Sequence, residues 1–177
     1  MSQDPRDQQR LGGAVPPGIT FRRPTEADYP TIIRVVDDWW GGRNLSKLLP
    51  RLWLQHFTGT SWLAEDSEGR LAGFLIGFLS PDQPDTAYAH MVATNPNLRR
   101  RGLGATLYDH FIADARAAGR SQVRAITWPG NRASLAFHRS IGFEIEGLPG
   151  SQNLYGTPAQ PGYDFDREDR AVMRRRI

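Results

Sequence analysis

The stretch Arg99-Arg100-Arg101-Gly102-Leu103-Gly104 decides how the rest of this sequence is interpreted. The residues before it, Tyr88 to Thr94, predict a strand, and Gly102 to Ala118 predict a helix whose apolar stripe includes Leu107 and Phe111. The first amides of such a helix are unpaired donors, and the helix dipole adds about half a positive charge at that end. The turn can therefore bind a phosphate or a pyrophosphate. The alternative is a glycine-rich turn with solvated arginines.

Other phosphate-binding motifs fit the sequence less well. A dinucleotide-binding fingerprint needs glycine where Leu107 stands in Gly102-Leu103-Gly104-Ala105-Thr106-Leu107. A P-loop needs Gly-Lys-Ser/Thr, whereas the only lysine, Lys47, lies between Ser46 and Leu48. The eight arginines within 99–139 are also compatible with an RNA- or DNA-binding module, but they lack interleaved aromatic residues. We therefore expect a small anionic cofactor and no nucleic-acid partner.

The composition is that of one globular domain. The chain has 177 residues, 39% of them hydrophobic, and no cysteine, which excludes disulfides, cysteine-ligated metals and a thiol nucleophile. The segment 1–17 has too few large apolar residues to fold, so we expect a disordered leader there and a single domain at 18–177. Met1 to Gln9 lacks the apolar segment of a secretion signal, and Leu71 to Leu79 is shorter than the roughly 20 residues of a membrane span. We expect a cytoplasmic protein with no membrane partner.

The remaining pattern alternates strands and helices, which is typical of an α/β fold. The expected strands are Ile19 to Arg22, a hairpin of Trp62 to Glu65 with Arg70 to Leu79, Val123 to Thr127, Phe143 to Glu146 and Arg170 to Met173. Further helices are expected after Thr25 and Asn131, and between Ser46 and Phe57 with an interruption at Pro50. Leu148 to Asp166 is expected to be a long loop.

Three linked motifs resemble the GCN5-related N-acetyltransferase (GNAT) superfamily. Arg99, Gly102 and Gly104 match its Arg/Gln-x-x-Gly-x-Gly/Ala signature, Asn131 matches the asparagine that opens its next helix, and His138 to Phe143 resembles its Tyr-x-x-x-Gly-Phe ending. The resemblance implies an α/β fold with a mixed central β-sheet that is splayed between strands 4 and 5 and flanked by about four helices. It implies an N-acetyltransferase that transfers an acetyl group from acetyl-CoA to a primary amine of a small molecule, peptide or protein. The alternative is a non-catalytic acyl-CoA sensor on the same fold.

The resemblance also implies which residues hold acetyl-CoA, mostly through their main chain. The pantetheine arm would lie in the gap of the sheet, and the pyrophosphate would lie at the turn. The cofactor-binding candidates are Val92, Ala93, Thr94, Arg99, Arg100, Arg101, Gly102, Leu103, Gly104, Ala105 and Asn131. An oxyanion would be stabilised by main-chain N–H groups around Val92 and Ala93.

The catalytic candidates are His138, His90 and Tyr88. His138 occupies the family's tyrosine position, where it would serve the leaving thiolate; the alternative is a histidine on the helix surface with no catalytic part. Strand alternation places His90 on one face with Tyr88, Val92 and Thr94, so His90 is a candidate base acting with Tyr88, or else a buried core histidine.

Several other residues are weaker or non-catalytic candidates. The weaker bases are Asp37, Asp38 and Glu65, while His56 and His110 are interpreted as surface residues. Four scattered histidines without metal-ligand spacing predict no metal site.

The acceptor site is expected at the end of the first helix and in the late loop. The substrate-binding candidates are Trp40, Arg43, Asp38 and Tyr155, because aromatic faces hold cations and an arginine suits a carboxylate. Trp39 is interpreted as part of the core. Homodimers are common in the family, so a homodimer is included in the prediction, although no stripe of residues identifies an interface.

Overall fold

The computed structural model describes residues 15–164 and 168–177, which form a seven-stranded mixed sheet and a separate two-stranded hairpin. The order across the sheet is β1-β2-β3-β4-β5-β9-β6, and β7 pairs with β8. The strands are β1 Thr20–Arg22, β2 Trp62–Glu65, β3 Leu71–Leu79, β4 Thr86–Thr94, β5 Gln122–Thr127, β6 Glu144–Ile145, β7 Gln152–Leu154, β8 Thr157–Ala159 and β9 Ala171–Arg176. Neighbouring strands are antiparallel except β4 and β5, which are parallel.

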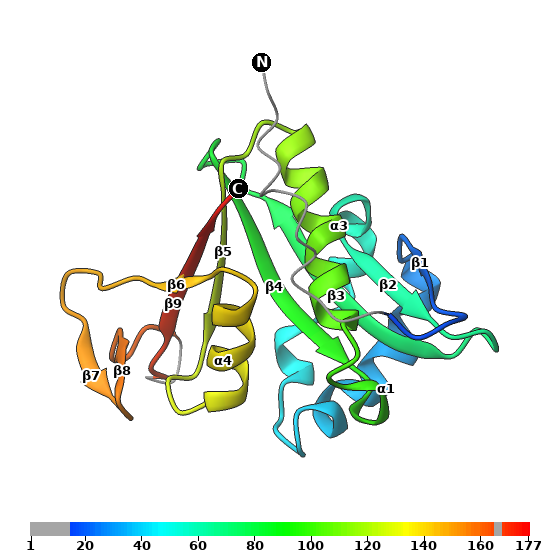
Figure 1. Cartoon of the computed structure of the whole chain (residues 1–177), viewed down its shortest axis with the longest axis horizontal. Helices are drawn as coiled ribbons and strands as arrows, with labels where there is room; N and C mark the ends of the chain where they lie inside the picture. The colour runs from blue at the N-terminus through cyan, green and yellow to red at the C-terminus, as the bar shows by residue number, and fades with distance from the viewer. Residues whose placement is uncertain (1–14, 165–167) are drawn as a thin grey trace.

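Helices cover both faces of the sheet. The α-helices of the described residues are α1 Tyr29–Trp39, α2 Leu52–His56, α3 Leu103–Ala117 and α4 Arg132–Ser140, and short 3-10 helices lie at Glu26–Asp28, Ser46–Leu48, Thr58–Thr60 and Pro96–Leu98. One core cluster contains side chains of α3 and α4, and the other contains side chains of α1 and α2. Figure 1 shows α3 and α4 in front of the sheet. The expected helix over 46–57 is split, because Pro50 interrupts it.

The sheet opens between β4 and β5, as the resemblance to the family implies. The two strands pair only where Thr86, Ala87 and Tyr88 lie beside Gln122, Val123 and Arg124. Beyond these residues the strands diverge (Figure 1), and β5 continues to pair with β9 along its full length. One edge of β4 therefore loses its partner after Tyr88, which leaves main-chain donors and acceptors available there.

A β-bulge lies in β4 at the point where the sheet opens. Ile76 of β3 pairs with Met91, but the next residue, Gly77, pairs with Ala89. His90 is therefore the extra residue of the bulge on β4, and it has no paired residue on β3.

The bulge overturns part of the predicted alternation. Tyr88 and His90 share a face, since their rings stack on Phe78 and on Trp53 of α2. Val92 and Thr94 were expected on that face as well, but Val92 packs in the cluster with α3, and Thr94 lies close to Gly104 of α3. The extra residue moves every later side chain of β4 to the opposite face, and this reversal cannot be read from a period-two pattern.

Two further expectations change at the ends of the domain. The expected loop after Leu148 contains the β7–β8 hairpin within its described part, and it continues into residues 165 and 166, which lie outside the described residues. Residues 1–14 of the expected leader also lie outside the described residues, whereas Val15 is partly buried and packs against the core.

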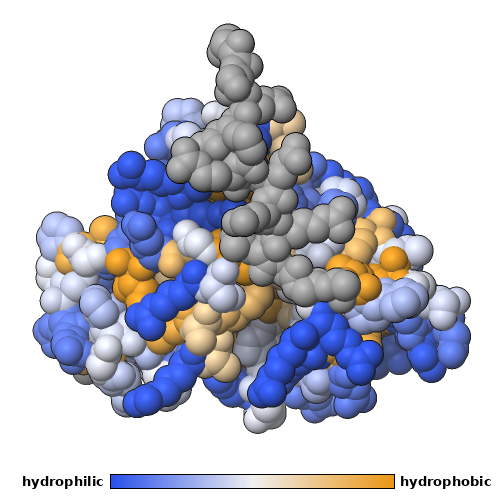
Figure 2. Space-filling view, in the orientation of Figure 1, coloured by the Kyte–Doolittle hydropathy of each residue, from blue (hydrophilic) through white to orange (hydrophobic). Residues whose placement is uncertain are grey.

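The surface is mostly polar on the face in view. Figure 2 shows separate apolar patches among hydrophilic residues on the face that carries α3 and α4. Within residues 15–164 and 168–177, every helix is too short or too polar to span a membrane, and acidic and histidine side chains do not gather in groups of three or more that could hold a metal ion.

Candidate active site

The turn before α3 has the backbone geometry of an anion site. Arg100 has φ 61° and Gly102 has φ 71°, so two nearby residues adopt the left-handed conformation. Such residues turn successive amides toward one concave side, and the first amides of α3 have no partner within the helix. The absence of a side chain at Gly104 lets α3 pack closely against Phe137 of α4, because a Cβ at this position would lie 3.0 Å from Cζ of Phe137. The turn can therefore bind a pyrophosphate through its main chain.

The three arginines of the turn differ in their contacts. The side chain of Arg99 donates a hydrogen bond to the main-chain oxygen of Trp39, at the end of α1. Arg100 and Arg101 are exposed to solvent. Arg99 thus ties the turn to α1, and the other two guanidinium groups supply positive charge around it.

The free edge of β4 offers Val92 and Thr94 rather than Ala93. The amide of Asn95 donates to the carbonyl of Ala72 on the β3 side. Because hydrogen-bonded pairs alternate along an antiparallel ladder, Ala93 also bonds with β3, while Val92 and Thr94 direct their N–H and C=O groups toward the gap. The expectation that Ala93 offers its main chain to the cofactor is therefore wrong, because its neighbour on β3 uses those groups.

Asn131 caps α4, as its position in the motif predicts. Its Oδ1 accepts a hydrogen bond of 3.2 Å from the amide of Ser134. The side-chain NH2 group remains as the donor that could reach a bound ligand.

His90 lies at the opening of the sheet with one nitrogen fixed. Its Nε2 lies 2.8 Å from the carbonyl oxygen of Leu48, and its ring stacks on Trp53 with centroids 4.1 Å apart. A carbonyl oxygen only accepts, so Nε2 carries the proton and Nδ1 keeps a lone pair. Burial lowers the pKa of His90, although the bond to Leu48 and the charge of Asp164 oppose that shift. His90 therefore has the protonation state that a general base requires at neutral pH.

Tyr88 belongs with His90 in one aromatic layer, which we define as Trp53, Phe78, Tyr88 and His90. Phe78 contacts Tyr88 on one side at 5.5 Å and Trp53 on the other at 5.9 Å, and Trp53 stacks on His90. Burial raises the pKa of the Tyr88 hydroxyl, so this group is a neutral donor at physiological pH. The structure thus brings Tyr88 and His90 onto one wall of the opening.

His138 lies apart from this layer, in the core. Its Nδ1 lies 2.8 Å from the carbonyl oxygen of Ser134, so it donates there, and its Nε2 accepts a 2.9 Å hydrogen bond from the hydroxyl of Tyr108. Burial lowers the pKa of His138, which keeps the ring neutral. His138 is 5% exposed and is not the surface histidine of the alternative interpretation. Both ring nitrogens have protein partners, so this geometry favours a structural role for His138.

The bond between Tyr108 and His138 gives a stability prediction. Tyr108→Phe leaves the buried Nε2 of His138 without a donor, which costs about 1–3 kcal/mol of the free energy of unfolding. Urea unfolding at pH 8 measures the loss. The matched control is Tyr155→Phe, because Tyr155 is 62% exposed and its hydroxyl is solvated. A change no larger in Tyr108→Phe than in this control would contradict the proposed pair.

The substrate candidates are only partly brought together. The guanidinium carbon of Arg43 lies 6.0 Å from the ring centroid of Trp128, and the ring of Tyr155 lies 5.1 Å from that of Trp128. Trp128, which is exposed at the end of β5, is one of the residues near the site that the sequence analysis did not identify. Trp40 instead packs toward Phe74 in the core, and Asp38 is exposed.

Three other expectations concern side chains near the site. Trp39 stacks on Phe74, which confirms its place in the core. Asp37 accepts hydrogen bonds from the amides of Leu45 and Ser46, so its carboxylate caps a 3-10 helix. His110 stacks on Trp62 and is half-buried, so its assignment to the surface is wrong.

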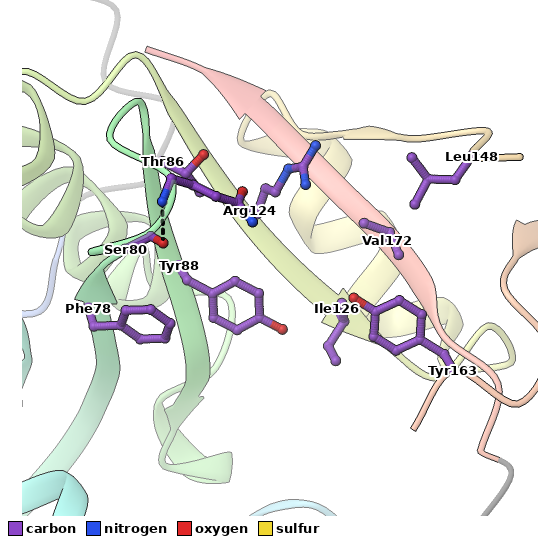
Figure 3. A pocket seen from close by; sticks show the side chains of 10 residues that line it. Phe78, Ser80, Thr86, Tyr88, Arg124, Ile126, Leu148, Tyr163 and Val172 are labelled. Carbon is purple, nitrogen blue, oxygen red and sulfur yellow. Dashed lines mark hydrogen bonds between the residues drawn. The ribbon is translucent and has the colours of Figure 1, made fainter. Parts of the chain in front are cut away.

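A cavity of about 150 Å³ lies beside Tyr88. Figure 3 shows the rings of Tyr88 and Tyr163 turned toward each other, with Ile126 between them. Its polar lining includes Thr86 of β4 and Arg124 of β5. These residues come from distant parts of the chain, and no local motif marks Arg124.

The comparisons with known proteins identify the class. Residues 29–143 match the sequence model of the family described as "Acetyltransferase (GNAT) family". The chain belongs to the GNAT family of acetyltransferases. This membership confirms the resemblance on which the predicted class of enzyme rests.

Relatives with assigned activities share one description. The L-2,4-diaminobutyric acid acetyltransferase of Nocardia farcinica (strain IFM 10152) is 32% identical over 132 residues, or 75% of this chain and 65% of the relative. This chain therefore spans slightly less than two thirds of that protein's length. The protein of the same name from Streptomyces coelicolor is 36% identical over 118 residues, or 66% of this chain and 69% of the relative.

Solved structures agree on the fold. Ard1 from Thermoplasma volcanium superposes with a TM-score of 0.72 at 20% identity, covering 90% of this chain and 98% of that one. The yncA protein of Salmonella typhimurium, solved with its cofactor acetyl-CoA, superposes with a TM-score of 0.64 at 21% identity, covering 89% and 93%. At these identities the likeness establishes the fold alone.

Proposed function

We propose that this enzyme acetylates the distal primary amine of a small amino acid, of the kind represented by L-2,4-diaminobutyrate. The proposal rests on two relatives, at 32% and 36% identity, that are both described as L-2,4-diaminobutyric acid acetyltransferases. A cavity of about 150 Å³ beside the opening of the sheet suits a small acceptor better than a peptide.

The residues around the gap fit acetyl-CoA, which supplies the activated acetyl group when it is bound. The amides at the start of α3 and the left-handed Arg100 and Gly102 would hold the pyrophosphate. Val92 and Thr94 would bond the pantetheine arm along the free edge of β4, and Asn131 would offer its NH2 group. The chemistry of this donor set, neutral amides with arginines nearby, suits a long polar ligand with a phosphate at one end.

His90 would act as the general base. A primary amine has a pKa near 10, so it arrives as an ammonium group and must lose a proton before it can attack. Nδ1 of His90 would take that proton, directly or through one water, while Leu48 holds Nε2 in place. The N–H of Val92 would stabilise the negative charge that develops on the acetyl oxygen. The bond between the acetyl carbon and sulfur then breaks, and coenzyme A leaves as a thiolate that takes a proton from solvent. Tyr88 would orient the acceptor as a neutral donor.

An acceptor panel tests the proposal. The chain is incubated with acetyl-CoA and one amine at a time, and thiol release is followed together with the mass of the product. We expect the highest kcat/KM for a short diamino acid, with acetylation of its distal amine. Binding of coenzyme A without thiol release for any amine would overturn the proposal in favour of a sensor.

Three expectations from the sequence remain predictions. We expect the enzyme in the cytoplasm, without a nucleic-acid partner, and as a homodimer. Its net charge of +3 is small, which agrees with a role for the arginines at the turn rather than along a nucleic acid.

A further inference from the structure

An arginine with unused donors lies in the wall of the cavity. Arg124 of β5 contacts Glu146 through Nη2, at 3.4 Å from either carboxylate oxygen, which is longer than a normal hydrogen bond. Its Nε is buried and has no hydrogen-bond partner. Glu146 bonds more closely to Arg174, at 3.2 Å. The guanidinium groups of Arg124 and Arg174 thus contact the same carboxylate, and Arg124 makes the longer contact.

The cavity presents this arginine to a small ligand. Arg124 lies beside Tyr88 in the register of the two strands, and Thr86 and Ser80 add polar groups near it. Ile126 and Val172 form an apolar part of the lining (Figure 3). A pocket with one cationic group, a few polar groups and an apolar wall is suited to a small molecule with one anionic end.

We infer that Arg124 binds the carboxylate of the acceptor and thereby sets the specificity of the enzyme for amino acids over simple diamines. The inference rests on the proposed function. A guanidinium group binds a carboxylate through two parallel hydrogen bonds, and Arg124 would turn its unpartnered Nε toward the cavity to supply one of the two donors. The nearby carboxylate of Glu146 makes a singly charged ligand more suitable than a phosphate, because repulsion grows with the charge of the ligand.

The spacing along β4 supports this placement. Tyr88 and His90 are two residues apart on one face, about 6–7 Å along the strand. In 2,4-diaminobutyrate the carboxylate carbon and the distal nitrogen are separated by four bonds, roughly 5 Å when extended. A carboxylate held beside Arg124, at the level of Tyr88, therefore brings the distal amine to the level of His90.

The other charged groups near the cavity are consistent with Arg124 as the group that binds the carboxylate of the acceptor. Asp164 acts electrostatically on both Tyr88 and His90, so a negative charge lies near these two side chains. Its carboxylate is paired with the buried Arg170 at 2.5 Å. Arg170 is therefore already engaged by a carboxylate, whereas Arg124 has a donor without a partner in the lining of the cavity.

The test compares two acceptors that differ by the carboxylate alone, 2,4-diaminobutyrate and 1,3-diaminopropane. For the wild type we expect kcat/KM to favour the amino acid, and in Arg124→Gln we expect this preference to fall at least about 10-fold, which corresponds to the loss of one charge-assisted contact. Arg124→Lys keeps the charge without the planar group and should give an intermediate preference. The matched control is Arg70→Gln, because Arg70 pairs with Asp66 in the turn between β2 and β3, outside the lining of the cavity, and this variant should keep the wild-type preference.

The outcomes separate this inference from the proposed function. Equal losses for both acceptors in Arg124→Gln, or an unchanged preference in a folded variant, would overturn the carboxylate role. If Arg124→Gln does not fold, the same comparison in Arg124→Lys decides, and an unchanged preference there overturns it. A wild-type enzyme that acetylates neither acceptor but does acetylate a different amine would instead overturn the proposed acceptor class.

Discussion

Replacing His90 with glutamine should lower kcat about 100-fold or more, while the KM for acetyl-CoA stays close to that of the wild type. General base catalysis contributes about 10²–10⁴-fold, and glutamine cannot accept the proton. Its side-chain NH2 group can still donate to the carbonyl of Leu48, as Nε2 of His90 does. The substitution therefore removes the base and leaves the local fold supported. Steady-state kinetics with a saturating acceptor measure the effect.

The control for this prediction is His56→Gln. His56 is exposed at the end of α2, close in sequence to Trp53 but outside the aromatic layer. We expect wild-type kinetics for it. Equal and small changes in kcat for the two glutamine variants would show that His90 is a core histidine, which is the alternative that the sequence left open.

The pH dependence gives a second readout of the same group. Burial lowers the pKa of His90 from 6.5, so Nδ1 is unprotonated at neutral pH and becomes protonated only in more acidic solution. We expect kcat to be level near neutrality and to fall as the pH decreases below 6.5 through the lowered pKa. This acid limb should be absent in His90→Gln. An unchanged acid limb in that variant would assign the titration to another group.

The turn before α3 could be predicted from sequence because its signals are local. A strand, an arginine-rich glycine turn, an amphipathic helix and the capping Asn131 follow one another, and each depends on neighbours within a few residues. The opening between β4 and β5 came from the resemblance of these motifs to a family. The four α-helices found among the described residues agree with that resemblance as well.

The walls of the acceptor site could not be predicted in the same way, because they depend on contacts between distant segments. Arg124 is one of eight arginines within 99–139, and only the pairing of β5 beside β4 places it next to Tyr88. Trp53 reaches His90 across 37 residues of sequence. The bulge at His90 is a property of the pairing between β3 and β4, and the residues of β4 alone carry no signal for it.

The environment of His138 is determined by its hydrogen-bond partner Tyr108, which its position in the sequence motif does not reveal. The motif places His138 where the family has tyrosine, which suggested an acid for the leaving thiolate. The structure pairs its Nε2 with Tyr108, a buried residue of α3 that lies outside the apolar stripe predicted from sequence. A buried polar side chain requires a partner, and here the neighbouring helix provides it.

Replacing Gly102 with valine should weaken the binding of coenzyme A about 100-fold, or about 2.8 kcal/mol, which is the loss of one or two charge-assisted hydrogen bonds. Gly102 has φ 71° at the start of α3, a conformation that a β-branched residue adopts only with strain. A valine there would turn the following amides away from the pyrophosphate and place a bulky side chain at the turn. Calorimetric titration of coenzyme A into the folded variant measures the loss.

The matched control lies at the other end of the same helix. Gly119 has φ 74° and has open space around its Cβ position, so Gly119→Val introduces a comparable backbone strain far from the turn. Both variants should lose about 1–2 kcal/mol of stability from the left-handed residue. Only Gly102→Val should lose affinity for coenzyme A, because only that end of α3 directs its free amides at a ligand. Equal affinities in the two variants would show that the amides of this turn do not bind the pyrophosphate.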